Sequence, residues 1–430
     1  MRRLPYQFLL RYAENVLHAR YGRGPNKKLV KPMLTGFYVT MKCNFRCTYC
    51  DDGSGNMYPD IPEHRLNTAK TIEVLEILRR ASPGLNITGG EPTVRGDIDE
   101  IFENVGRLGF CPVTFNTNAF LLDRHLSCLH HIDYLVISLD SPDPQRSDDL
   151  INLSKGGQTE RVKRNIQLAK DYRQEHKLKF DFIINTVIFP ETIDDAWDTF
   201  EFCLENDFYW TPMPYIVGKY PCPGLVDNPR WQGLIDEVSR AKRKGARVYG
   251  NMEALRTIRD FKRFECYPTT HAIVHPHGDI FYPCAPLGLE AGNLLETGDY
   301  YKTMAIGEER HGPVPYCDAR CHVGCYTEGS TAISHPEEGI AEAFRFLFRW
   351  RKPEIVLQRP ERAHTPVMPP AFDELRALPS LPPDTIRKLR KEGLLVNDFT
   401  SRVRIKGEED FMPPVQLTRE PVFAAKSVSA

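Results

Sequence analysis

Three cysteines lie within eight residues near the beginning of the sequence, where Cys43, Cys47 and Cys50 form a C-x3-C-x2-C pattern. Thiolates are soft ligands that bind zinc or iron–sulfur clusters. A structural zinc site needs a fourth ligand, for which His64 is the nearby candidate. A [4Fe–4S] cluster held by three cysteines instead keeps one iron open for the amino and carboxylate groups of a methionine-like ligand.

A second group of five cysteines lies in the C-terminal half of the chain. Its members are Cys266, Cys284, Cys317, Cys321 and Cys325. Five thiolates are enough for one [4Fe–4S] cluster with one to spare, and the spacing leaves open which of the last three are ligands. A zinc site from four of them is the alternative. No export signal is evident, so the twelve cysteines of the chain favour metal or redox chemistry over disulfides.

These cysteines must be positioned by a scaffold, and the sequence between the two groups alternates strand-like and helix-like segments. The runs that predict strands are Phe37–Met41, Leu85–Thr88, Val113–Phe115, Tyr134–Leu139, Phe180–Ile188 and Phe208–Ile216. Helical periodicity lies between them, with Gly109 as a stop after Ile98, Ile101, Phe102, Val105 and Leu108. Strands that alternate with helices predict an α/β fold with a parallel sheet, either doubly wound or barrel-like.

Polar or glycine residues directly follow or end three of the predicted strands. These positions are Gly89, Gly90, Glu91, Asn116, Asn118, Ser138 and Asp140. Glycines let a ligand approach the backbone closely, the Glu91 carboxylate offers an acceptor for an ammonium group, and asparagine amides bond to hydroxyls. Ordinary turns and helix caps are the alternatives. Since ligands bind at the carboxyl ends of parallel barrel strands, we expect these residues at one face of the sheet.

The cysteine loop, with Tyr49 just before its third cysteine, resembles the signature of the radical S-adenosylmethionine (SAM) superfamily. The residues at the strand ends resemble further motifs of this family, and the resemblance extends from about Leu34 to about Val217. It implies a partial (β/α)6, TIM-like barrel in which the three cysteines hold a [4Fe–4S] cluster and its open iron binds SAM. Tyr49 and the strand-end residues would contact SAM.

The resemblance also implies a reaction. Enzymes of this family cleave SAM reductively to methionine and a 5′-deoxyadenosyl radical, and the radical abstracts hydrogen from a substrate. An electron donor such as flavodoxin or ferredoxin would be a partner of such an enzyme.

The C-terminal cysteines resemble a second feature of the same family. A predicted hairpin around Gly278 separates Cys266 from Cys284, and a Gly292-Asn293 segment follows. This arrangement resembles the auxiliary-cluster domains called SPASM and, in a shortened form, twitch. The resemblance implies one auxiliary [4Fe–4S] cluster bound by four of the five cysteines, which would anchor the substrate or take up an electron.

Two further residues are weak candidates. Cys222 lies in a Pro-rich loop beyond the sixth predicted strand, where it could donate a hydrogen atom to a substrate radical or add a cluster ligand; a bystander is the alternative. In related enzymes an arginine some dozen residues after the position of Ser138 meets the SAM carboxylate. Leu150 falls near that spacing here, so the closest arginine, Arg146, is the weak candidate for this contact.

The remaining pattern divides the chain into four parts. We expect a basic amphipathic segment over 1–33, the radical SAM barrel over 34–250, the auxiliary-cluster domain over 251–335, and a basic helix with a Pro-rich tail over 336–430. The first 32 residues carry eight Lys or Arg against one Glu. A helix of this composition either lies in an anionic membrane interface or packs on the barrel with a solvated basic face.

Composition narrows the class of function. The 430 residues include 56 Lys and Arg against 57 Asp and Glu, which argues against nucleic-acid binding through bulk charge. No apolar run is long enough to span a membrane and no secretory signal is evident, so we expect a cytoplasmic protein, with peripheral membrane contact as an open hypothesis. The expected function is a radical SAM enzyme acting on a lipid-like or small molecule. A peptide-modifying maturase and a zinc-stabilised binding protein are the alternatives.

Overall fold

The computed structural model describes most of the chain. The described residues are 5–47, 49–50, 65–151, 156–217, 220–312, 321–347 and 354–362, followed by the short strands β12 (Leu395–Asn397), β13 (Arg402–Ile405) and β14 (Val415–Gln416). These three strands form an antiparallel sheet of their own. Two residues considered above as ligands, His64 and Cys317, lie outside the described residues.

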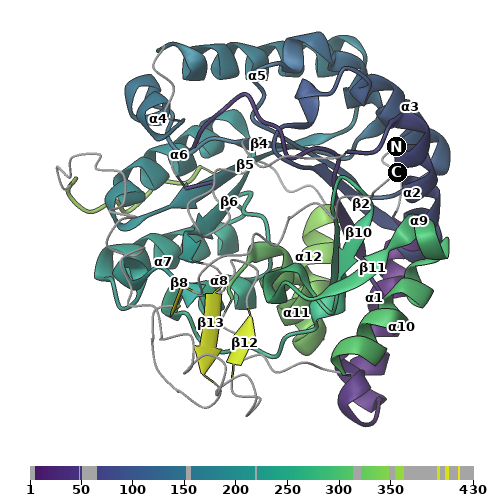
Figure 1. The fold of residues 1–430 in the computed structure, drawn as a ribbon. Helices are drawn as coiled ribbons and strands as arrows, with labels where there is room; N and C mark the ends of the chain where they lie inside the picture. The colour runs from purple at the N-terminus through teal and green to yellow at the C-terminus, as the bar shows by residue number, and fades with distance from the viewer. Residues whose placement is uncertain are drawn as a thin grey trace.

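A nine-stranded sheet forms the centre of the described structure (Figure 1). Six neighbouring strands run parallel, and they are β1 (Leu34–Tyr38), β2 (Gly84–Thr88), β3 (Val113–Thr117), β4 (Tyr134–Ser138), β5 (Asp181–Ile188) and β6 (Tyr209–Pro214). Their order in the sheet is their order in the chain. The predicted α/β fold with a parallel sheet is therefore confirmed, and this strand order is that of the expected partial barrel.

Helices cover the outer face of this parallel sheet. They are α2 (Thr68–Ala81), α3 (Ile98–Leu108), α4 (Pro144–Ile151), α5 (Gln158–Glu175) and α6 (Ile193–Asn206). In α3 four of the five predicted apolar positions are buried, among them Ile98, Phe102 and Val105, and Leu108 is partly buried. Gly109 ends this helix with a φ of 73°, a left-handed conformation that glycine adopts without strain.

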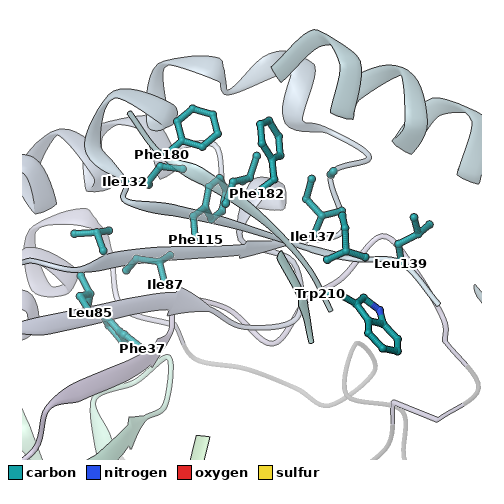
Figure 2. Close-up of a cluster of buried hydrophobic side chains, with 14 of the residues drawn as sticks. Phe37, Leu85, Ile87, Phe115, Ile132, Ile137, Leu139, Phe180, Phe182 and Trp210 are labelled. Carbon is teal, nitrogen blue, oxygen red and sulfur yellow. The ribbon is translucent and has the colours of Figure 1, made fainter. Parts of the chain in front are cut away.

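The hydrophobic core lies between the strands and these helices. Alternate residues of a strand point to opposite faces of the sheet. Phe115 of β3 therefore points outward, and its ring lies 4.7 Å from the ring of Phe102 in α3. Figure 2 shows Phe115, Phe180 and Phe182 in the layer between the strands and the helices. This apolar layer fixes the strands and leaves their other face for different side chains.

The inner face of the sheet is more polar and less buried. It carries, near the carboxyl ends of the six strands, Tyr38, Thr88, Asn116, Ser138, Asn185 and Met213. Ser138 is exposed and the other five are partly buried. Polar groups and partial exposure make this face the surface on which a ligand could lie.

The C-terminal cysteine region continues the same sheet. The strand β9 (His271–Val274) pairs in parallel with β1, and β10 (Asp279–Phe281) and β11 (Glu290–Asn293) follow in antiparallel order. The predicted hairpin is confirmed, since Ile280 pairs with Val274 and Gly278 in the turn has a φ of 94°. The barrel and the second cysteine group are therefore joined through hydrogen-bonded strands.

The other helices pack around this sheet. They are α1 (Tyr6–Tyr21), α7 (Pro229–Arg243), α8 (Met252–Asp260), α9 (Leu294–Thr297), α10 (Tyr300–His311), α11 (Gly324–Ser334) and α12 (Pro336–Leu347), while β7 (Ile216–Val217) and β8 (Tyr220–Pro221) form a small hairpin. The start of α11 reaches the inner face, because a Cβ on Gly324 would lie 2.7 Å from Cε of Met213. Among the described helices, none combines the length and the hydropathy that crossing a bilayer requires.

Candidate active site

The cysteine loop begins after β1 and is fastened to the end of β2. The N–H of Gly90 donates to the carbonyl of Thr40 at 2.7 Å, and the N–H of Glu91 donates to the carbonyl of Lys42 at 2.8 Å. The two strand ends therefore run side by side up to the residue before Cys43.

Gly89 and Gly90 make this close approach possible. A Cβ on Gly89 would lie 2.2 Å from the carbonyl oxygen of Thr40, and one on Gly90 would lie 2.4 Å from that of Lys42. Gly89 also has a φ of 150°, which residues with a side chain rarely adopt. These contacts explain both glycines by packing between strand ends, while close approach of a ligand to them stays a prediction.

The buried carboxylate of Glu91 joins the end of β2 to the end of β3. One oxygen accepts from the N–H and the hydroxyl of Thr93, at 3.0 and 2.6 Å, and from the hydroxyl of Thr117 at 2.8 Å. The other oxygen accepts from the N–H of Asn118 at 2.6 Å. Burial raises the pKa of Glu91, and these four donors oppose the rise. The contacts give Glu91 a positioning role, and its expected bond to an ammonium group stays a prediction.

Asn118 links the end of β3 to the first cysteine. Its side-chain nitrogen donates to Oδ1 of Asn44 at 2.9 Å and lies 3.8 Å from Sγ of Cys43. The same sulfur accepts from the N–H of Phe45 at 3.3 Å. Asn118 therefore holds the beginning of the cysteine loop at the carboxyl edge of the sheet.

Tyr49 links the end of the cysteine loop to β4 and β5. Its hydroxyl donates to Oδ2 of Asp140, the second residue after the end of β4. Oδ1 of Asp140 accepts from the N–H of Val187 in β5 at 2.8 Å. Burial raises the pKa of Asp140 to about 6, although both hydrogen bonds favour its charged form. The residue before the third cysteine is thus fixed at the same edge of the sheet as Asn118.

The three partly buried thiols of the loop lie close enough to one another for their charges to interact. Burial raises the pKa of Cys43 to about 12 and that of Cys47 well above its ordinary value, and the charge of Cys50 adds to both shifts. Within the described residues, no three His, Cys, Asp or Glu side chains converge tightly enough for a single metal ion. A cubane binds each thiolate at a separate iron, so it needs cysteines around a shared space. The loop fits a [4Fe–4S] cluster, whose iron would stabilise the thiolate forms.

Four C-terminal cysteines gather around the first turns of α11. They are Cys266, Cys284, Cys321 and Cys325. Burial raises the pKa of Tyr326 in α11, and the charges of three of these cysteines add to the rise. The fourth, Cys266, has its sulfur 3.8 Å from the hydroxyl of Ser330, about one turn further along the helix. The four described cysteines are therefore neighbours of one helix.

Tyr38 lies between the two groups of cysteines. It ends β1 on the inner face, and its ring lies 5.9 Å from that of His275, which follows β9. Burial raises the pKa of Tyr38, and the charges of Cys325 and Cys50 add to the rise. One side chain is thus close enough to both groups to be affected by each. Sequence reasoning missed Tyr38 because only the pairing of β1 with β9 brings the groups together.

The other sequence candidates lie in different surroundings. Asn116 and Ser138 are on the inner face at the carboxyl ends of β3 and β4. Cys222 is buried just after β8, and its role stays a prediction. Arg146 forms a bidentate ion pair with the buried carboxylate of Asp195. Its guanidinium therefore already has a carboxylate partner, which argues against the suggested contact with SAM.

Comparison with known families identifies the barrel. Residues 37–203 match the Radical SAM superfamily. This part of the chain is a radical SAM domain. This superfamily uses a [4Fe–4S] cluster and SAM, and the chain is an enzyme of this type. The predicted family, enzyme class and SAM-binding cluster are therefore confirmed, and the matched region contains the cysteine loop with all three strand-end motifs.

Relatives with assigned names are similar over different shares of the chain. A probable GTP 3′,8-cyclase from Methanothermobacter thermautotrophicus is 28% identical over 290 residues, which are 63% of this chain and 89% of that protein. A GTP 3′,8-cyclase from Aquifex aeolicus is 26% identical over 39% of this chain and 52% of its own length. Among solved structures, Streptococcus suis SuiB bound to S-adenosylmethionine is 21% identical with a TM-score of 0.44, over 58% of this chain and 60% of SuiB.

Proposed function

We propose that the cysteine loop of this radical SAM enzyme holds the cluster and that the ends of β2, β3 and β4 hold SAM. The cluster ligands are Cys43, Cys47 and Cys50. One observation carries the proposal: three strand ends contact this loop, through the backbone of Gly90, the amide of Asn118 and the Tyr49–Asp140 hydrogen bond. When bound, the cluster supplies the electron for reductive cleavage of SAM.

The protein's own residues position the ligand and shield it. Asn116 and Ser138 present an amide and a hydroxyl to the inner face, where they can bond to the hydroxyls of a ribose. Glu91 fixes the ends of β2 and β3 relative to one another. The buried side chains of Phe45 and Leu139 next to the loop help to exclude water from the site.

We assign the auxiliary [4Fe–4S] cluster to the four described cysteines of the second group, Cys266, Cys284, Cys321 and Cys325. They surround the start of α11, and this start lies against Met213 on the inner face. Because Tyr38 is near both groups, a substrate on the inner face would lie between the two clusters. This placement supports a role of the auxiliary cluster in anchoring the substrate or accepting an electron. A zinc-stabilised site from the same cysteines is the alternative.

We favour a small molecule as the substrate. The polar inner-face residues Asn116, Ser138 and Asn185 suit a ligand that forms hydrogen bonds better than the lipid-like substrate that the sequence left open. Relatives named GTP 3′,8-cyclase make GTP the first candidate to test. A peptide substrate, modified as by a maturase, is the second candidate.

The cluster assignment is tested by SAM cleavage. We expect the anaerobically reconstituted full chain, reduced with dithionite or flavodoxin, to be brown and to form 5′-deoxyadenosine. Replacing Cys43, Cys47 and Cys50 together by Ala is expected to abolish the product and to remove about four irons. The control Cys111→Ala lies far from the loop in sequence, and this variant is expected to keep its iron content and to form 5′-deoxyadenosine. Unchanged cleavage in the triple variant, or a colourless zinc protein, would refute the assignment.

The substrate is tested by deuterium transfer. Deuterated GTP, a deuterated peptide pool and a deuterated lipid extract are supplied separately with SAM and reductant. Deuterium is expected in 5′-deoxyadenosine only from the pool that contains the substrate, because the radical takes hydrogen from it. Transfer from the peptide or lipid pool alone would overturn the proposal of a small-molecule substrate, without affecting the cluster assignment.

A further inference from the structure

One face of the N-terminal helix α1 is fixed to the rest of the protein. The hydroxyl of Tyr12 donates to the carbonyls of Ala332 at 2.8 Å and Pro336 at 3.2 Å. Asn15 is buried and exchanges hydrogen bonds of 2.8 and 3.0 Å with the backbone of Lys31. These contacts hold α1 against α11, so the orientation of its opposite face is determined.

The opposite face of α1 carries a row of large apolar side chains that reach solvent. Tyr6, Leu10, Leu17 and Tyr21 are 58%, 67%, 58% and 71% exposed. At about 100° per residue, these four positions fall within about 60° of the helix circumference. They form one stripe along all 16 residues of α1, which we name the α1 stripe. In Figure 1 this helix, in purple, lies at the outer edge of the molecule.

The surroundings of the α1 stripe are positively charged. Arg20 is exposed beside it, and Arg23 is exposed two residues after the end of the helix. Glu14 supplies the negative charge among the first 32 residues, and it is paired with Lys31. The charge next to the apolar row is therefore cationic, with its acidic neighbour already neutralised.

We propose that the α1 stripe inserts into the surface of an anionic membrane. Amphipathic helices bind in the plane of a bilayer when apolar side chains enter the headgroup boundary and cations contact anionic headgroups. Tyr6 and Tyr21, at the two ends of the stripe, suit this boundary because each combines an apolar ring with a polar tip. We favour an anionic membrane over a second copy of the chain, because the exposed Arg20 beside the stripe complements anionic headgroups. The proposal does not depend on the substrate of the enzyme.

Vesicle flotation of the reconstituted full chain tests this proposal. We expect the protein to float with vesicles of phosphatidylcholine and phosphatidylglycerol, to bind pure phosphatidylcholine less, and to dissociate as salt is raised. The double variant Leu10→Ser, Leu17→Ser is expected to bind at least about tenfold more weakly, because two apolar side chains no longer leave water. Arg20→Glu is expected to weaken binding to the anionic vesicles. The matched control Leu168→Ser, Val356→Ser changes exposed apolar residues elsewhere and is expected to bind normally.

Two further measurements keep the outcome clear. Circular dichroism and the rate of SAM cleavage without lipid are expected to be unchanged in the Leu10→Ser, Leu17→Ser variant, since both side chains are exposed. Equal binding of the wild type to neutral and anionic vesicles, or undiminished binding of this variant, would overturn the proposal. A dimer in light scattering that the same variant dissociates would assign the α1 stripe to self-association instead and would also overturn it.

Discussion

The hydroxyl of Tyr49 donates a hydrogen bond to the buried carboxylate of Asp140, 91 residues further along the chain. This bond joins the residue before the third cysteine to the end of β4. Asp140 in turn accepts from the backbone of Val187 in β5. The cysteine loop is therefore anchored to the carboxyl edge of the sheet at its end as well as at its beginning, and its geometry depends on side chains that are not cluster ligands.

Replacing Tyr49 by Phe should loosen the loop without removing a ligand of the cluster. The buried carboxylate of Asp140 then loses a donor, which costs about 1–3 kcal/mol. A loss of this size in transition-state stabilisation slows SAM cleavage about five- to hundredfold. We expect a lower melting temperature and slower formation of 5′-deoxyadenosine at unchanged iron content. Tyr172→Phe removes a hydroxyl that bonds to His130 on the surface and serves as the control. Full stability and activity of the Tyr49 variant would contradict its positioning role.

Replacing Gly90 by Ala should separate the end of β2 from the cysteine loop. The new Cβ would meet the carbonyl oxygen of Lys42 at 2.4 Å, so the backbone must move and the hydrogen bond to Thr40 is strained. We expect a loss of about 1–3 kcal/mol in the free energy of unfolding and a lower iron content after reconstitution. Gly96→Ala is a matched control, because nothing lies within 4 Å of a Cβ there. Equal denaturation midpoints for the two variants would argue against close packing between Gly90 and the carbonyl of Lys42.

Much of the barrel and its motifs could be predicted because their signals are local. Apolar runs mark the strands, and each ends in polar residues such as Asn118 or Asp140 that cannot continue a buried strand. Parallel strands then bring these ends to one edge, which is why the contacts of Asn118 with the cysteine loop follow from the pattern. The partners of individual side chains do not follow from it. Glu91 has a carboxylate that suits an ammonium group, but its four donors come from the protein.

The relation between the two cysteine groups could not be predicted. It depends on the parallel pairing of β9 with β1, which places His271 opposite Leu34. Such pairing joins segments far apart in the chain and leaves no periodic signal in either. For this reason the sequence suggested separate structural units, whereas Tyr38 lies close to cysteines of both groups.

His271, at the start of β9, should make the protein less stable in acid. Burial lowers its pKa to about 4, whereas an unfolded histidine titrates near 6.5. Below pH 6.5 the unfolded chain therefore binds a proton that the folded chain does not, so stability falls with pH until about pH 4. At pH 5 this linkage removes about 2 kcal/mol relative to pH 7.

The variant His271→Asn isolates this effect because it has no proton to bind. We expect its free energy of unfolding to fall about 2 kcal/mol less than that of the wild type between pH 7 and pH 5. Acid effects on the cysteine sites cancel in this comparison, since both proteins carry the same cysteines. The control His311→Asn changes a histidine that is only partly buried and is expected to follow the wild type. If the free energy of unfolding falls equally with pH in the wild type and in His271→Asn, burial of His271 is not the cause of the acid sensitivity.

Cys325 and Cys317 should differ in their effect on the auxiliary cluster. Cys325 lies with three other cysteines around α11, and the proposed auxiliary cluster takes these four as its ligands without Cys317. We therefore expect Cys325→Ala to lose about four irons per chain and one of two electron paramagnetic resonance signals after reduction, and Cys317→Ala to keep both. Because the loop at Cys43 is untouched, both variants should still cleave SAM. In Cys325→Ala this cleavage should no longer convert the substrate to product. Loss of the signal in Cys317→Ala but not in Cys325→Ala would exchange the two residues in the ligand set.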